Sequence, residues 1–157
     1  MSHGQKASPG PSIRPKRCHR EVMPLRKPPN PATLSDRLVE KARQRFQRVT
    51  ARQAATEVAA GALLIDIRTT EQRRRDGEIP GARSIERTVL EWRLDPTSPW
   101  SIAEVASTDA RVILICAEGY SSSLAAASLQ DLGLVHATDV IGGVEAWKAA
   151  GLALREA

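Results

Sequence analysis

Short, unbroken apolar runs recur along the second half of the chain. Val112–Ile115 is apolar throughout, and residues 63–67 form a second run that only Asp66 interrupts. Runs of this kind are typical of parallel strands that helices bury on both faces. We predict strands over residues 63–67, 83–86, 112–115 and 139–141.

The segments between these runs predict helices: most hold spaced apolar and small residues, and residues 70–76 are charged. We expect helices over residues 51–60, 70–76, 89–94, 121–132 and 143–150. Gly61, Gly133 and Gly151 each follow a predicted helix, where a terminating glycine is common. Helices that alternate with buried strands supply right-handed crossovers. The sequence therefore predicts an α/β fold, with an open central parallel β-sheet flanked by helices on both faces.

The N-terminal third has a different character. Residues 1–32 are rich in Pro, Lys, Arg and Ser, and we predict a disordered, basic, Pro-rich tail. Residues 33–48 predict an amphipathic helix that Thr33 or Ser35 caps. We expect its apolar face to pack on the domain rather than to bind a partner. The apolar residues of this face recur at every fourth position: Leu34, Leu38, Ala42 and Phe46. The predicted folded domain then spans residues 49–157.

Charge is distributed unevenly. Residues 1–48 hold 12 Lys and Arg against 3 Asp and Glu, whereas residues 49–157 hold 11 against 15. A basic tail suits an acidic partner or nucleic acid, but a solvated extension explains the composition better, so we do not expect nucleic-acid binding. No apolar run approaches the roughly 18 residues of a membrane span. No apolar stretch follows the initial Met, so we expect a cytoplasmic protein and no membrane partner.

The candidate chemistry lies at Cys116, directly after the predicted strand 112–115. A short loop containing Gly119 follows, and a helix of small residues begins near Ser121. In open α/β sheets, ligands bind beyond the carboxyl ends of the strands. Converging loop amides and a helix N-terminus bind an anion without a basic side chain. We therefore expect this loop to stabilise a thiolate or persulfide, with serine hydroxyls from 121–123 capping the helix or bonding to substrate.

Alternatives to a reactive Cys116 are limited by the rest of the sequence. Free cysteine is common as an inert core residue, but the glycine-containing loop favours function here. His136 follows the far end of the predicted helix, about 16 Å from Cys116 at 1.5 Å per residue, so it is not expected to act as a base. Cys18 lies in the tail and is expected to be a bystander thiol. The absence of a CxxC motif or a Cys/His cluster argues against a zinc site.

Four motifs, in order, resemble the rhodanese-like (sulfurtransferase) domain family over residues 50–153. They are Leu63–Arg68 with Glu71, Gly77–Ala82, the Cys116 loop, and Gly142–Trp147 with Gly151. The resemblance implies that Cys116 is the nucleophile, which accepts sulfane sulfur from a donor and passes it to a thiol or another nucleophile. It implies no cofactor and no metal. The implied substrate-binding loop consists of Ala117, Glu118, Gly119, Tyr120, Ser121 and Ser122.

Other motif residues are expected to support the fold. Asp66 is a carboxylate at a strand end and should hold neighbouring loops through hydrogen bonds. Arg68 is expected to pair with Asp66 or Glu71. Trp147 should pack in the core. Trp92 and Trp100 flank a Pro-containing loop. Their side chains are expected either to pack in the core or to line the mouth of the pocket.

Three departures from the family pattern bear on substrate choice. Glu78 stands where the family often has His, a change we expect to be tolerated. Ser121 stands where thiosulfate-using members often have Arg, and Glu118 adds a carboxylate to the loop. We therefore predict weak use of thiosulfate. The related cell-division phosphatases have a longer loop that ends in Arg, and Ser122 holds that place here, so phosphate would lack its bidentate partner.

Two other functions stay open at this stage. The same fold serves as a non-catalytic binding or regulatory module, although such a module has no physical need for Cys116. A carrier would instead deliver its persulfide to one partner protein, with residues 1–48 as the docking arm. The sequence leaves the donor, the acceptor and the oligomeric state undetermined.

Overall fold

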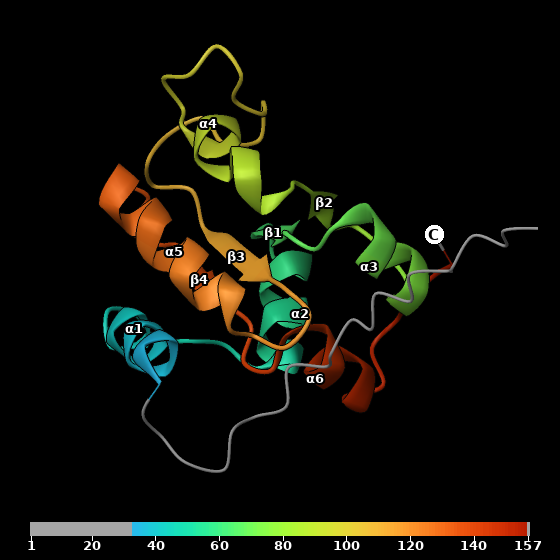
Figure 1. Ribbon diagram of the computed structural model, residues 1–157. Helices are drawn as coiled ribbons and strands as arrows, with labels where there is room; N and C mark the ends of the chain where they lie inside the picture. The colour runs from blue at the N-terminus through green and yellow to red at the C-terminus, as the bar shows by residue number, and fades with distance from the viewer. Residues whose placement is uncertain (1–32, 157) are drawn as a thin grey trace, which may run out of the picture. The chain divides into compact units, whose positions relative to one another are not determined.

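The computed structural model describes residues 33–156, and its centre is a parallel β-sheet. Across these residues the strands are β1 (Leu63–Asp66), β2 (Arg83–Ser84), β3 (Val112–Ile115) and β4 (Thr138–Asp139). They lie in the order β2-β1-β3-β4 (Figure 1). Asp66 pairs with both Ser84 and Ile115, so β1, β2 and β3 end at one edge. The predicted open parallel sheet is confirmed.

Helices form where local signals are strong. The helices are α1 (Leu34–Arg43), α2 (Ala51–Ala59), α3 (Thr70–Asp76), α4 (Leu90–Leu94), α5 (Ser121–Leu132) and α6 (Gly143–Ala149), with a 3₁₀ turn at Arg87–Val89. Three begin at a threonine that forms a reciprocal capping box with the third residue of the helix: Thr33, Thr50 and Thr69. These caps satisfy amides that a helix start otherwise leaves unbonded.

Alternate residues of β1 and β3 enter two separate apolar cores. Ile65 and Leu114 face a core that also holds side chains of α4 and α5. Leu64, Ile113 and Ile115 face the other core, together with side chains of α2 and α6. Trp147 lies in this second core, only 5% exposed, and its indole N–H donates to the carbonyl of Ala153. The sheet is therefore covered on both faces, as the sequence predicts.

The first helix packs on α5, but only through part of the face that the spacing predicts: Ala42 is buried and Phe46 packs on the core, whereas Leu34 and Leu38 do not. Leu34 is 80% exposed and Leu38 is 55% exposed, whereas Val39 and Ala42 are buried. Positions four apart drift around a helix of 3.6 residues per turn, so the predicted stripe does not stay on one side. The helix also ends at Arg43, so that Phe46 lies beyond it and packs against the core beneath α5.

Two further predictions need correction. Trp92 and Trp100 are 59% and 67% exposed, so core packing is wrong for both, because α4 buries Leu90 and Leu94 instead. The last strand is Thr138–Asp139 rather than residues 139–141, since the chain beyond Val140 turns into α6. Over residues 33–156, no helix is long and apolar enough to cross a membrane. The predicted tail, 1–32, lies outside the described residues.

Candidate active site

Cys116 follows the last residue of β3 and lies at the base of the loop that leads into α5. It is a free thiol, 7% exposed, and its side chain belongs to the core on the α5 side of the sheet. The sulfur therefore lies under the first turn of α5, at the carboxyl edge of the parallel strands. Ligand sites of open α/β sheets lie at this edge.

Two backbone amides of the loop donate to this sulfur. The N–H of Gly119 lies 3.2 Å from Cys116 Sγ, and the N–H of Ser122 lies 3.4 Å from it. The thiol itself donates to Ser122 Oγ at 3.2 Å. Oriented amides around one atom form a concavity that favours negative charge, so the loop is suited to a thiolate or a persulfide.

The loop carbonyls are held by donors outside the loop. The N–H of Val144 donates to the carbonyl of Cys116 at 2.9 Å, and that of Glu145 donates to the carbonyl of Ala117 at 3.1 Å. The α6 turn lies so close that a Cβ on Gly143 would stand 2.4 Å from the Cys116 oxygen. A trans peptide directs its N–H opposite to its carbonyl. The amides of Ala117 and Glu118 are therefore directed away from α6.

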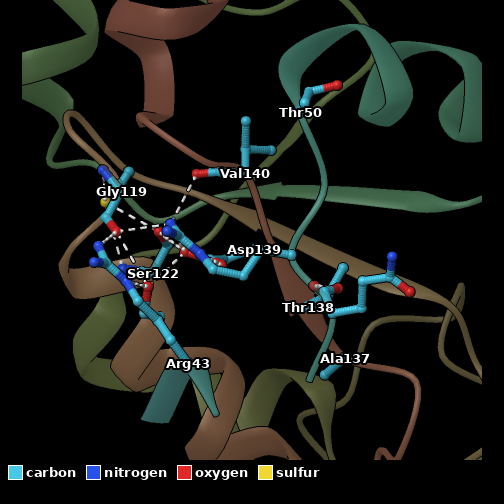
Figure 2. Close-up of polar contacts among 12 residues, drawn as sticks. Arg43, Thr50, Gly119, Ser122, Ala137, Thr138, Asp139 and Val140 are labelled. Atoms are coloured by element: carbon cyan, nitrogen blue, oxygen red, sulfur yellow. Dashed lines mark hydrogen bonds and ion pairs between the residues drawn. The ribbon is translucent and has the colours of Figure 1, made fainter. Parts of the chain in front are cut away.

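Gly119 is the point at which the loop meets α1 and β4. Its φ of +81° is left-handed, and a Cβ there would approach the Gly142 nitrogen to 2.7 Å. Its carbonyl accepts from Arg43 Nη2 at 2.8 Å and from Arg48 Nη2 at 3.0 Å. Figure 2 shows Arg43 reaching toward Gly119 beside Ser122 and Asp139.

A fully buried carboxylate, Asp139 at the end of β4, connects these groups. It accepts from the hydroxyls of Ser122 at 2.9 Å and Ser123 at 2.8 Å. Arg48 donates to it through Nε at 2.6 Å and Nη2 at 2.9 Å. A hydrogen-bonded path therefore runs from the Cys116 thiol through Ser122 to Asp139.

Sequence reasoning missed Asp139, Arg43 and Arg48 as neighbours of the loop. One signal was available for Asp139, because a carboxylate at the end of a buried strand needs partners, the same reasoning that was applied to Asp66. No spacing in the sequence points to the two arginines, which lie more than 70 residues before Gly119.

The remaining loop residues occupy distinct places. Ser121 is exposed, and Ala117, Glu118 and Tyr120 are half-buried. The prediction that a serine caps α5 is wrong: Tyr120 is the N-cap residue, and the hydroxyls of Ser122 and Ser123 bond to Asp139 instead. One carboxylate, that of Glu118, stands in a loop sequence without Lys or Arg.

Asp66 and Arg68 form a buried ion pair beside the site. Arg68 Nη2 lies 2.6 Å from Asp66 Oδ2, and the same nitrogen donates to the Gly77 carbonyl at 2.8 Å. Arg68 pairs with Asp66 and not with Glu71. These bonds tie the end of β1 to the end of α3. Among the described residues, Arg68 Nη1 is buried without a hydrogen-bond partner.

His136 does not meet Cys116. It is exposed and precedes β4, so it lies at the amino edge of a parallel sheet whose carboxyl edge holds the sulfur. Within residues 33–156, no group of three or more His, Cys, Asp and Glu side chains is arranged to hold a metal ion. The described site consists of one sulfur, backbone amides and a serine–aspartate pair.

A cysteine at the end of a parallel strand, in a loop of converging amides, defines an α/β domain with a cysteine-based anion cradle. The Rhodanese-like domain family matches residues 48–150, and the chain belongs to this family. The thiosulfate sulfurtransferase GlpE of Pseudomonas entomophila is 33% identical over 103 residues, which cover 66% of this chain and 85% of the relative.

Two solved structures extend the comparison. A protein of unknown function from Rhodopseudomonas palustris, described as a possible tyrosine phosphatase, has a TM-score of 0.71 and 30% identity, covering 82% of this chain and 98% of its own. A rhodanese-related protein from Thermoplasma volcanium has a TM-score of 0.55 and 24% identity, covering 69% and 97% of the two chains. The second likeness concerns the fold alone.

Proposed function

We propose that this protein is a sulfurtransferase in which Cys116 carries the transferred sulfur as a persulfide. The observation that carries the proposal is the pair of amide donors on Cys116 Sγ, from Gly119 and Ser122. An inert core thiol has no use for an anion-binding loop. The family and its sulfurtransferase relative support the same reaction.

The reaction has two balanced steps. In the first, the Cys116 thiolate attacks the sulfane sulfur of a donor persulfide, an S–S bond forms on Cys116, and the donor leaves as a thiolate. In the second, an acceptor thiolate attacks the outer sulfur, takes it as a persulfide, and releases the Cys116 thiolate. Each step exchanges one S–S bond for another, so neither an external oxidant nor a cofactor is needed.

The charges around the loop favour a donor with little negative charge. Glu118 is half-buried in the loop, and the loop sequence offers no cation to a thiosulfate dianion. Arg43 and Arg48 bond to the outer carbonyl of Gly119. We expect a low-molecular-weight or protein-bound persulfide to react faster than thiosulfate. The acceptor is a thiol, either small or on a partner protein, and a free catalytic thiol suits the reducing cytoplasm.

Phosphate transfer is not expected, although one similar structure is described as a possible tyrosine phosphatase. Ser122 stands where a phosphate-binding arginine would be needed, and its hydroxyl already bonds to Asp139. A dianionic phosphate in the cradle would lack a guanidinium partner.

Mass spectrometry of the intact protein tests the proposal. After incubation with cysteine persulfide, which carries less negative charge than thiosulfate, we expect a mass gain of one sulfur atom, which a reducing thiol removes. The gain should vanish in Cys116→Ser and persist in Cys18→Ser, the matched control for the second cysteine. A sulfur that loads equally well onto Cys116→Ser, or no loading from any donor, would refute the proposed function. A higher loading rate with thiosulfate than with the persulfide would overturn the donor preference.

A further inference from the structure

We propose that Arg43 is a positioning residue for sulfur transfer. It holds the Gly119 carbonyl on the outer side of the loop and so keeps the Tyr120 amide directed at the outer sulfur of the Cys116 persulfide. The inference rests on the proposed function and assigns a role to a residue that lies outside the matched family range, 48–150.

Arg43 contacts the loop at three places. Its Nη2 donates to the Gly119 carbonyl at 2.8 Å, and its Nε donates to Ser123 Oγ at 3.1 Å. Its guanidinium carbon also lies 5.3 Å from the centre of the Tyr120 ring, within the range of a cation–π contact. One planar group thus fixes the loop, the N-cap residue of α5 and the first turn of that helix.

The direction of the Tyr120 amide follows from this contact. Gly119 and Tyr120 share a peptide bond, and the described residues contain no cis peptide. The N–H of Tyr120 therefore points opposite to the Gly119 carbonyl. Since that carbonyl faces the arginines, the amide faces the opposite side of the loop. It joins the amides of Gly119 and Ser122, which already donate to Sγ.

The carbonyl depends on Arg43 because its two other donors are both shared with Asp139. The Ser123 hydroxyl lies 3.1 Å from the Gly119 carbonyl and 2.8 Å from Asp139 Oδ2, and it has a single proton to donate. Arg48 Nη2, which also reaches the Gly119 carbonyl, donates at the same time to Asp139 Oδ2 at 2.9 Å. Arg43 Nη2 donates to the carbonyl at 2.8 Å, the shortest of the three distances, and its Nε donates to a hydroxyl rather than to a carboxylate. The last residue of α1, Arg43, therefore helps to hold the loop that surrounds Cys116.

Alkylation of Cys116 by iodoacetamide, followed by peptide mass mapping, tests the proposal without any sulfur donor. At about pH 7 we expect Arg43→Gln to slow alkylation of Cys116 about tenfold, because freeing the Gly119 carbonyl also loosens the Gly119 amide that donates to Sγ. The effect should be smaller than the loss of an oxyanion donor, since the amide is released rather than removed. Alkylation of Cys18 in the same samples should not change.

Arg45→Gln is the matched control. Arg45 also reaches α5, but it pairs with the exposed Asp131 at 2.6 Å rather than with the loop. Its variant should keep the wild-type rates within about twofold. Arg43→Lys, which retains the charge but offers a single donor centre, should fall between wild type and Arg43→Gln. If Arg43→Gln folds poorly, the alkylation rate of Arg43→Lys still tests the proposal.

Persulfide formation separates positioning from direct binding of the donor. If Arg43 positions the loop, Arg43→Gln lowers kcat for neutral and anionic donors alike and leaves KM nearly unchanged. Equal alkylation rates in Arg43→Gln and Arg45→Gln would overturn the proposal, as would a loss confined to KM for anionic donors. If the wild type takes up no sulfur, the proposed function fails. The alkylation comparison still decides whether Arg43 positions the loop amides around Cys116.

Discussion

Replacing Gly119 by alanine tests whether close backbone contacts at this residue hold the Cys116 loop in place. Gly119 has a φ of +81°, and an added Cβ would lie 2.7 Å from the Gly142 nitrogen and 3.1 Å from the Val140 oxygen. Both contacts are with backbone, which cannot rotate away as a flexible side chain does. The alanine variant must therefore hold the strain or shift the loop.

The cost has two parts. A left-handed conformation costs an L-residue about 1–2 kcal/mol. Overpacking against fixed neighbours adds about 1–3 kcal/mol. We expect Gly119→Ala to lower the free energy of unfolding by about 2–5 kcal/mol, the sum of these two ranges.

Gly81 offers a matched control, because its φ is +82° and a Cβ there would meet nothing within 4 Å. Gly81→Ala should cost only the conformational part, about 1–2 kcal/mol. Both changes restrict the unfolded chain equally, so this effect cancels in the comparison. Urea unfolding followed by Trp fluorescence measures the difference, and alkylation of Cys116 reports whether Gly119 N–H still reaches the sulfur.

A loop that shifts to relieve the contact would recover stability but slow alkylation of Cys116. A loop that stays in place would lose the stability instead. The reasoning is refuted if Gly119→Ala is no less stable than Gly81→Ala and also alkylates at the wild-type rate.

Three further predictions concern the frame around the site. Asp66→Ala leaves the Arg68 guanidinium buried and unpaired, so the free energy of unfolding in urea should fall by about 3–5 kcal/mol. Trp147→Ala empties a site in the core beneath α6 and should cost about 3–5 kcal/mol by the same measurement. The hydrogen bond from Arg75 lowers the pKa of Asp76, so the stability that Asp76 adds is complete above the unfolded value of about 3.9 and is lost as the pH falls through the folded one. The free energy of unfolding should therefore fall less steeply with decreasing pH in Asp76→Asn than in the wild type. Equal slopes in the two proteins would contradict this assignment.

The elements that the sequence predicts to the residue carry at least one strong local signal. The helix 70–76 begins after Thr69, whose side chain bonds to the Gln72 amide, and ends at Gly77. The helix 121–132 ends at Gly133, whose φ is +111°. The strand 112–115 is apolar throughout and buried throughout. In each case the residues that define the element lie within it or directly beside it.

The parts that the sequence does not reveal depend on contacts between distant residues. Which face of α1 is buried is decided by its packing on α5, and periodicity alone selects Leu34 and Leu38 wrongly. Arg43 meets Gly119 across 76 residues, and Arg48 meets Asp139 across 91. Neither pairing leaves a motif, because a guanidinium can approach a carbonyl from any element that happens to pack nearby.

The placement of the two arginines also bears on which donor the site prefers. A cation beside the sulfur would stabilise a thiolate and attract an anionic donor at the same time. Here the guanidiniums of Arg43 and Arg48 bond to the Gly119 carbonyl, and Arg48 also bonds to Asp139. Neutral groups, the amides of Gly119 and Ser122 and the Ser122 hydroxyl, are therefore what contact the sulfur. The amides stabilise a bound anion without adding net charge to the loop. A site built in this way separates activation of the thiol from recruitment of the donor, so the donor must be recognised by features other than its charge.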